Sequence, residues 1–316
     1  MAATLETDIV FVYGALRSGT TLFKVMLAAH EGIANPGETD FLFDHLTPDP
    51  GHPTGWRYDR TALAEDRIFR DRALVLPEGK DGLDLLADLL AQISAAAPGR
   101  VVTLNVHRHA ERLRAILPAA RILHLLRDPR DVARSAIVMG WAGNLWYGVM
   151  PWVHTEQSWD RAAAGLAPGQ VLTLTYETLF EDLEGSLRRV CGFLGVPYSA
   201  RMLDYHLNTS YGPPDASLAW QWRRRATPRE IALVEGRAGS LMRARGYDLA
   251  GSGSVPGGLD RLGLALQNKV RIWQFGIRRF GLRVFLGEKL MRWLGFEEAR
   301  RHLKRQMSAI SRQYLK

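Results

Sequence analysis

The residues best suited to chemistry lie in a short loop, residues 14–21, with the sequence GALRSGTT. The loop follows an apolar run and precedes an amphipathic segment, so we expect a strand, a loop and a helix in that order. Helix N–H groups, hydroxyls and an arginine together bind phosphate well. The donors that we assign to this anion site are Arg17, Ser18, Gly19, Thr20 and Thr21. The alternative is an ordinary glycine turn with a solvated Arg17.

The loop departs from the usual nucleoside triphosphate motif at one position. Its two glycines have the expected spacing, but Thr20 stands where that motif has a lysine. Arg17 would then supply the positive charge. A nucleotide-dependent kinase that uses this loop stays as an alternative function.

A second anion site is predicted in residues 121–139, RILHLLRDPRDVARSAIVM. Arg127 ends an apolar run, and Pro129 begins a segment of helical spacing that carries Ser135. Arg127 and Ser135 are then close enough to bind one small anion. Two such sites at the strand ends of one sheet imply a ligand with two separated phosphates on one nucleoside.

A third motif follows in residues 174–179, LTYETL, together with residues 193–196, FLGV. The order and spacing of this motif and the two anion sites resemble the sulfotransferase family over about residues 8–248. The tyrosylprotein and bacterial sulfotransferases are the most similar members in motif.

The resemblance implies 3′-phosphoadenosine 5′-phosphosulfate as the sulfate donor. In that family the loop holds the 5′-phosphosulfate, and an arginine and a serine eight residues apart hold the 3′-phosphate. Arg127 and Ser135 keep this spacing. Tyr176 matches the tyrosine that lies near the adenine.

Glu38 is the candidate general base, in a loop at residues 35–40 that should return to the mouth of the phosphate loop. It stands 21 residues after Arg17, as does the glutamate base of the tyrosylprotein sulfotransferases and many bacterial relatives. Asp40 is the alternative base or a substrate-binding residue. A capping or salt-bridged role for Glu38 also stays open.

A catalytic lysine that many relatives carry is absent. The corresponding region, residues 104–109, reads LNVHRH, with Asn105 at the lysine position. His107 or Arg108 would then supply donors to the leaving group. We therefore assign catalysis to Glu38, Arg17 and His107.

Some conspicuous residues have a structural explanation. Arg130 and Arg134 are four residues apart, and we expect them on a solvated helix face. His124 lies within an apolar run and is expected in the core. The tryptophans of residues 140–159 either line an apolar or sugar-stacking acceptor pocket or pack the helical cap.

The fold that must position these groups is predicted to be α/β, a parallel β-sheet like that of phosphate-loop proteins, flanked by helices. The expected strands are residues 8–13, 100–104, 121–126 and 170–175. The expected helices are residues 20–30, 82–97, 129–139, 180–194 and 228–245, the last with a capping box at Thr227 and Glu230. Residues 48–80 show no clear pattern.

We place the α/β domain at residues 1–250, a linker at residues 251–258 and a basic amphipathic helical tail at residues 259–316. The chain has a formal net charge of +8, and residues 252–316 contain 14 basic and 4 acidic residues. The positive charge therefore lies in the tail, and the rest of the chain is nearly neutral. This distribution argues against a nucleic-acid partner.

The basic tail predicts contact with an anionic membrane surface or a partner subunit, and oligomerisation is left open. The alternative is a pair of helices packed on the domain with their basic faces in water. A single cysteine, Cys191, an N-terminus without a basic region and the lack of a long apolar run predict a cytoplasmic protein, peripheral to the inner membrane surface if the tail binds lipid.

No cluster of metal-ligand residues is apparent, so we expect no metal. The acceptor is expected to be a hydroxyl of a small molecule, lipid or glycan. The missing lysine leaves one further alternative, a membrane-associated nucleotide-binding protein without turnover.

Overall fold

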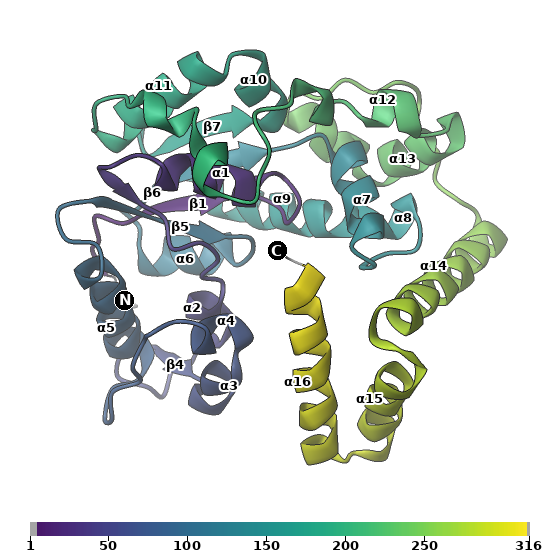
Figure 1. Ribbon diagram of the computed structural model, residues 1–316, viewed down its shortest axis with the longest axis horizontal. Helices are drawn as coiled ribbons and strands as arrows, with labels where there is room; N and C mark the ends of the chain where they lie inside the picture. The colour runs from purple at the N-terminus through teal and green to yellow at the C-terminus, as the bar shows by residue number, and fades with distance from the viewer. Residues whose placement is uncertain (1–4, 315–316) are drawn as a thin grey trace. The chain divides into compact units, whose positions relative to one another are not determined.

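β1 (Val10–Tyr13) lies in the middle of a five-stranded parallel sheet in the computed structural model, which describes residues 5–314 (Figure 1). The strand order is β2-β5-β1-β6-β7. The other strands are β2 (Ile33–Ala34), β5 (Val101–Val106), β6 (Arg121–Leu126) and β7 (Val171–Thr175). Each of their described pairings is parallel, which confirms the predicted α/β class.

Alternate side chains of β1 enter two separate hydrophobic cores, because successive strand residues point to opposite faces. Phe11 and Tyr13 pack on one face with α5 (Gly82–Ala95), α6 (Ala110–Ile116) and α9 (Met150–Ala163). On the other face, β1 residues Val10 and Val12 pack with α1 (Thr20–Ala28) and α11 (Leu183–Leu194). Helices on both faces explain why the strands are continuous apolar runs (Figure 1).

The helix predicted at residues 180–194 is two helices, α10 (Tyr176–Glu181) and α11. Asp182 leaves the helical conformation between them and accepts a hydrogen bond from the backbone N–H of Gly185 at 3.0 Å. An aspartate that caps the second helix therefore interrupts the first.

The stretch without a clear sequence pattern holds short elements. They are α2 (Phe41–Asp44), α3 (Arg60–Glu65) and α4 (Arg67–Arg70), with an antiparallel pair of β3 (Leu46–Pro48) and β4 (Trp56–Tyr58). Asp59 and Asp66 begin α3 and α4 by accepting backbone N–H groups. Three 3-10 turns follow α11, at Ala200–Met202, Tyr205–Asn208 and Ala216–Leu218.

The sheet and these elements form one compact unit, made of the described residues up to Asp128 with Pro151–Gln221 and Ala244–Tyr247. A second unit comprises residues 129–150, 222–243 and the described residues from 248 onward. Its helices are α7 (Pro129–Val138), α8 (Leu145–Gly148), α12 (Trp222–Arg225), α13 (Pro228–Ala244), α14 (Gly258–Phe280), α15 (Leu282–Leu294) and α16 (Glu297–Tyr314).

α13 begins with the predicted capping box. The backbone N–H of Thr227 donates to Glu230, and that of Glu230 donates to the Thr227 hydroxyl, at 2.9 and 3.3 Å. The sequence therefore predicted the N-terminus of this helix correctly from Thr227 and Glu230.

Arg130 does not lie on a solvated face, so that prediction is wrong. It is buried, its Nη1 lies 2.7 Å from Glu235 Oε1, and its guanidinium carbon lies 3.6 Å from the centroid of the Trp222 ring. Arg134 on the same helix is more exposed and donates to the Arg225 carbonyl. A charge spacing typical of a helix surface thus includes one buried ion pair.

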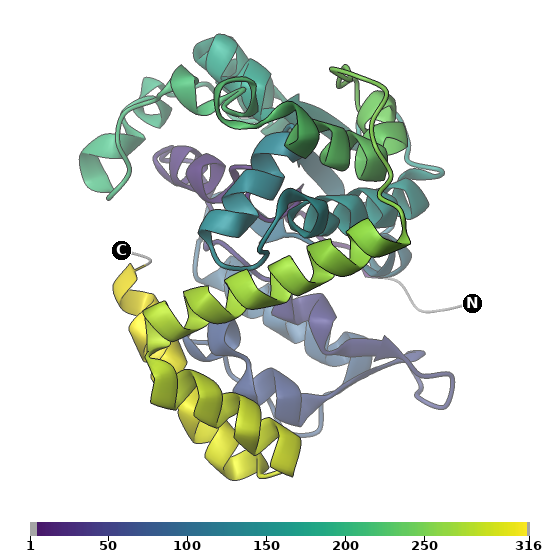
Figure 2. The same cartoon turned by 90° about the vertical axis from the view of Figure 1, so that its right-hand side faces the viewer.

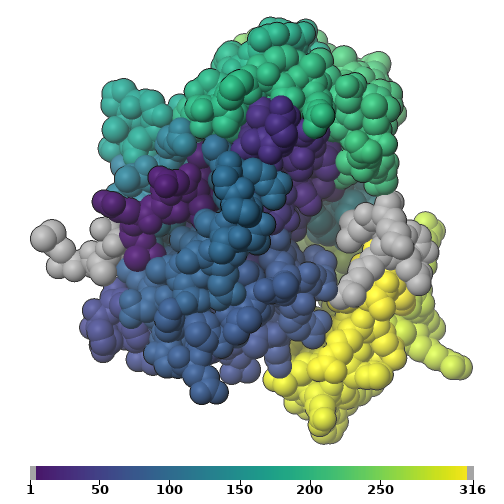
Figure 3. Space-filling model, turned by 60° about the vertical axis from the view of Figure 1, so that its left-hand side comes forward, coloured from purple at the N-terminus to yellow at the C-terminus, as the bar shows by residue number. Residues whose placement is uncertain are grey.

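The helical extension after residue 250 is present, and the predicted boundary at that residue stays a prediction. Figure 2 shows α14 as one long helix, with α15 and α16 side by side. Arg300 of α16 pairs with Glu288 of α15 at 3.4 Å, and the yellow surface of α16 is open to view in Figure 3. No helix within residues 5–314 is long and apolar enough to cross a lipid bilayer.

Candidate active site

The loop between β1 and α1 has a backbone that its two glycines make possible. Gly19 has a φ of 92°, in the left-handed region. A Cβ at Gly19 would overlap the Tyr176 ring, and a Cβ at Gly14 would overlap the carbonyl of Leu125. The loop therefore closes directly against β6 and the first residue of α10.

Unmet hydrogen-bond donors gather at this loop. No side chain caps the N-terminus of α1, and its first turn contains no acidic residue. Ser18 is fully buried, yet its Oγ has no hydrogen-bond partner within residues 5–314. Free N–H groups, the helix dipole and a buried hydroxyl together fit an anion.

One arginine of the loop, Arg17, lies beside a second arginine, Arg127, which follows β6. Arg127 donates to the Arg17 carbonyl at 3.2 Å, and its guanidinium carbon lies 4.1 Å from the centroid of the Tyr176 ring. Burial, followed by the nearby Arg127 charge, lowers the pKa of Arg17. Two cations held together away from water favour an anion between them. The structure thus brings Arg17, Arg127 and Tyr176 into one site.

Ser135 lies on α7, in the second unit. Its joint contact with Arg127 on one phosphate stays a prediction.

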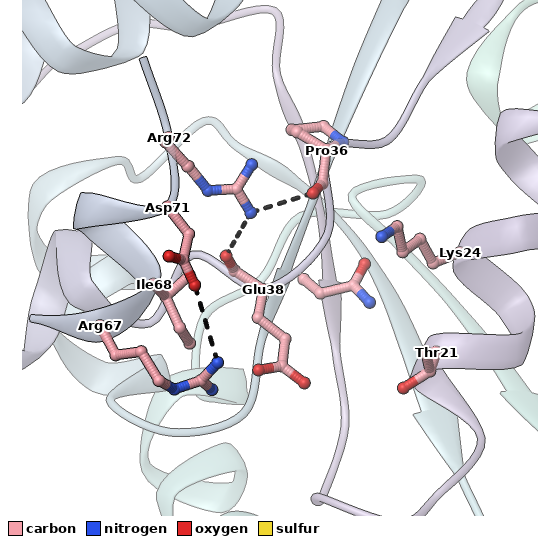
Figure 4. Close-up of a pocket in the computed structure, with 9 residues that line it drawn as sticks. Thr21, Lys24, Pro36, Glu38, Arg67, Ile68, Asp71 and Arg72 are labelled. Atoms are coloured by element: carbon pink, nitrogen blue, oxygen red, sulfur yellow. Dashed lines mark hydrogen bonds and ion pairs between the residues drawn. The ribbon is translucent and has the colours of Figure 1, made fainter. Parts of the chain in front are cut away.

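Glu38 faces a cavity of about 310 Å³ close to the loop. The lining residues are Thr21, Lys24, Pro36, Glu38, Arg67, Ile68, Asp71, Arg72 and Asn105. Figure 4 shows the Glu38 carboxylate between Arg67 and Thr21. The backbone at Glu38 is held by Arg72, which donates to the carbonyls of Pro36 and Glu38 at 2.9 and 2.7 Å. Within the described residues the carboxylate itself makes no hydrogen bond or ion pair, so it is available to a ligand in the cavity.

Lys24 is a cation of this cavity that the sequence analysis missed. Burial, followed by the Arg72 charge, lowers the pKa of Lys24, and the Glu38 carboxylate acts in the opposite direction. Lys24 follows Thr20 by four residues, which places both on one face of α1. That spacing was the signal that would have identified it.

Asn105, at the position of the missing lysine, joins three segments. Its side chain donates to the Thr20 carbonyl at 3.1 Å and accepts from Asn35 at 3.0 Å. It lines the same cavity as Lys24 and Glu38. Asn105 thus holds the loop in place without supplying charge.

Comparison with known proteins identifies a family that this chain matches. A model of the sulfotransferase family fits residues 9–200, which is more than half of the chain and spans the loop, Glu38, Arg127 and Tyr176. The chain belongs to the sulfotransferase family. It is therefore a transferase enzyme.

Individual proteins similar to this sulfotransferase carry sulfotransferase names as well. A Caenorhabditis briggsae protein whose name assigns it to the protein-tyrosine sulfotransferases is 26% identical over 216 residues, covering 63% of this chain and 69% of that protein. The fold is similar to the sulfotransferase domain of the curacin biosynthetic pathway (TM-score 0.56, 20% identity, 78% of this chain and 100% of that one). It is also similar to the sulfotransferase domain of the Synechococcus PCC 7002 olefin synthase (TM-score 0.58, 20% identity, 79% and 97%).

The histidine and aspartate predicted near the reacting centre of this sulfotransferase lie behind the loop. His107 is buried between Asp40, which accepts from its Nδ1 at 2.7 Å, and the Thr20 hydroxyl, which lies 3.1 Å from its Nε2. Asp40 is buried and does not line the cavity of Glu38. Arg108 pairs with Asp44, and its Nη1 also lies 4.0 Å from Asp40 Oδ2.

Other conspicuous residues are structural. His124 pairs with Glu156 at 3.4 Å and stacks on Trp159, with ring centroids 4.1 Å apart. Trp152 is also fully buried. These residues pack the core, as expected for His124, and the two tryptophans do not line the cavity of Glu38.

Proposed function

We propose that this sulfotransferase moves the sulfuryl group of 3′-phosphoadenosine 5′-phosphosulfate to the hydroxyl of a small molecule, lipid or glycan. The observation that carries the proposal is the cluster of Arg17, Arg127 and Tyr176 at a loop whose buried Ser18 hydroxyl has no partner in the described chain. Two positive charges, a buried hydroxyl and an aromatic ring together suit an anionic adenine nucleotide.

For the donor, we assign the 5′-phosphosulfate to the loop. Arg17, the N–H groups of Gly19 and Thr20, and the hydroxyls of Ser18 and Thr21 donate to its oxygens. A second group of residues holds the other end of the nucleotide. Arg127 and Ser135 bind the 3′-phosphate, and Tyr176 contacts the adenine.

For the reaction, the acceptor hydroxyl enters the cavity beside Glu38. Its oxygen forms a bond to sulfur as the bond from sulfur to the phosphate oxygen breaks, and Glu38 takes the hydroxyl proton. The electron pair of the broken bond stays on the phosphate, which leaves as adenosine 3′,5′-bisphosphate. Arg17 and Lys24 stabilise its growing negative charge, because positive groups fixed in advance near that charge lower the barrier.

Glu38 is a better candidate for the base than Asp40. Its carboxylate faces the cavity and is free of hydrogen bonds within the described residues, whereas both oxygens of Asp40 accept from His107. The reaction as written needs no metal. No group of three or more histidine, cysteine, aspartate or glutamate side chains placed to hold one occurs in residues 5–314.

We propose a cytoplasmic enzyme whose tail rests on an anionic membrane surface. Leu259, Leu262 and Leu266 follow one another at helical spacing on α14 and are between 64% and 87% exposed. Apolar residues along a basic helix suit the interface of an anionic bilayer. Co-sedimentation with phosphatidylserine vesicles, but not with phosphatidylcholine vesicles, is the expected result, and equal recovery with both would refute this role.

Two measurements test the proposed activity. Calorimetry is expected to show tight binding of adenosine 3′,5′-bisphosphate and weak binding of ATP with magnesium. Incubation of ³⁵S-labelled donor with cell extract should then label an acceptor. Tight ATP binding combined with indifference to the bisphosphate would favour a kinase, and donor binding without any transfer would favour a binding protein.

A further inference from the structure

Three buried side chains form a hydrogen-bonded chain beneath the phosphate loop. Asp40 precedes α2, His107 follows β5 and Thr20 is the first residue of α1, and none is more than 4% exposed. Asp40 Oδ2 lies 2.7 Å from His107 Nδ1, and His107 Nε2 lies 3.1 Å from the Thr20 hydroxyl oxygen. The chain therefore links a buried carboxylate to the loop that we assign to the donor.

The direction of the first bond follows from the chemistry of its partners. The other carboxylate oxygen of Asp40 accepts the backbone N–H of His107, also at 2.7 Å. A carboxylate only accepts, so the proton of the bond between Asp40 Oδ2 and the ring belongs to Nδ1 of His107. This arrangement leaves Nε2 to face Thr20.

The second bond has two possible directions. A neutral ring accepts the Thr20 O–H at Nε2, and the hydroxyl then has no proton to offer a phosphate. A protonated ring donates to the hydroxyl oxygen, and the O–H proton is then free to point into the loop. Only the second direction makes Thr20 a donor to an anion.

Bound phosphate favours that second direction. With the nucleotide in place, His107 stands between the Asp40 carboxylate on one side and the phosphate beyond Thr20 on the other. The charged group behind Asp40 is Arg108, whose Nη1 lies 4.0 Å from Oδ2. From α9, the Thr155 hydroxyl donates to the His107 carbonyl and not to the ring.

We propose that Asp40 and His107 position the Thr20 hydroxyl as a hydrogen-bond donor to the 5′-phosphate, with His107 held as an imidazolium in the nucleotide complex. The inference rests on the proposed function. It places a positive charge one hydrogen bond behind a loop that has no lysine. His107 is a positioning residue, because it does not touch the nucleotide and keeps its protons throughout.

Calorimetry with adenosine 3′,5′-bisphosphate tests the chain through a double-mutant cycle. His107→Asn keeps an N–H toward Asp40 but no longer reaches Thr20, while Thr20→Val removes the hydroxyl with little change of shape. Each is expected to raise Kd about tenfold, the size of one charge-assisted hydrogen bond. The double variant should be no weaker than Thr20→Val alone, because His107 acts through Thr20.

Three controls separate positioning from a general structural role. His107→Gln restores a donor toward Thr20 and should recover part of the affinity. Adenosine 3′-monophosphate, which lacks the 5′-phosphate, should bind every variant equally. His124→Asn alters a second buried histidine–carboxylate pair, with Glu156, and should leave Kd unchanged. Full additivity in the cycle, or equal losses for the monophosphate, would overturn the proposal.

Nitrogen-15 NMR of the histidine rings tests the protonation state on the unaltered protein. The His107 signals are identified by their absence from the His107→Asn spectrum, or through Thr20→Val if that variant does not fold. In the bisphosphate complex both ring nitrogens are expected to carry protons, and an unprotonated Nε2 would refute the imidazolium. If the unaltered protein does not bind the bisphosphate, the proposed function falls together with this inference. If it binds normally and the cycle is additive, the inference alone falls.

Discussion

The cavity around Glu38 and the buried cluster around Glu235 place a glutamate carboxylate in opposite surroundings. Glu38 is partly exposed, and its carboxylate has no hydrogen-bond partner in the described chain. Glu235, in the second unit, is 3% exposed and accepts from Arg130 and from the backbone N–H groups of Ala250 and Gly251, at 2.7, 2.8 and 3.1 Å.

The difference separates a group that serves a ligand from one that serves the fold. A buried carboxylate without partners is costly, so full satisfaction is typical of a structural role. A carboxylate left unsatisfied at a cavity keeps its lone pairs for a substrate. Substitutions at the two glutamates should therefore affect different properties of the protein.

Replacement of the cavity glutamate should have the largest effect. Glu38→Gln is expected to reduce transfer of ³⁵S-labelled sulfate about 10²- to 10⁴-fold, because it removes the proton acceptor. The Kd for adenosine 3′,5′-bisphosphate should stay within a few-fold of that of the unaltered protein. Unchanged turnover would remove Glu38 from the mechanism.

The matched change in the second unit is Glu235→Gln, which removes the Glu235 charge from its buried ion pair with Arg130. Breaking one side of such a pair costs about 3–5 kcal/mol. Thermal or denaturant unfolding should show this loss, whereas transfer by the protein that remains folded should be normal. An unchanged free energy of unfolding together with reduced sulfate transfer would contradict a structural role for Glu235.

Glu177 shares features with both Glu38 and Glu235. It is buried and accepts from the Asp128 N–H and the Tyr247 hydroxyl, but burial raises its pKa to about 7. The folded protein then holds a proton that the unfolded chain releases near pH 4.5, so stability falls as pH rises from about 4.5 to about 7 and levels off above. Glu177→Gln should remove about 3 kcal/mol of this dependence. If the free energy of unfolding changes equally between pH 5 and pH 8 in the unaltered protein and in Glu177→Gln, the raised pKa is contradicted.

Arg127→Ala should have a smaller effect, confined to binding. The Arg127 hydrogen bonds in the structure go to the carbonyls of Arg17 and Leu218, so stability should change little. Calorimetry is expected to show about a 10- to 100-fold rise in Kd for the bisphosphate, the loss of one arginine–phosphate contact. Arg134→Ala, which also removes a bond to a backbone carbonyl, is the control and should not alter Kd.

Local patterns in the sequence predicted the sheet and the loop well. The strands are apolar because helices cover both faces, and the loop glycines are needed by the backbone itself, so both features appear in a few adjacent residues. The capping box at Thr227 is of the same kind. Such features depend on neighbours in the chain.

Features that depend on distant partners were not predictable. Arg130 reads as a surface residue until Glu235 and Trp222, about a hundred residues away, are placed against it. Lys24 reads as an exposed helix residue until the loop at Pro36 forms the opposite wall of its cavity. The catalytic and binding roles of the site residues stay predictions.

The contact between Gly19 and the Tyr176 ring carries a practical consequence for redesign of the nucleotide specificity. Any side chain at position 19 needs both the space that the aromatic ring now fills and a left-handed backbone that favours glycine, so a change at position 176 alone does not make position 19 permissive. Libraries that randomise position 19 should yield mostly misfolded or inert clones, even when position 176 also varies, and those that keep Gly19 and vary the other loop positions should yield more active ones.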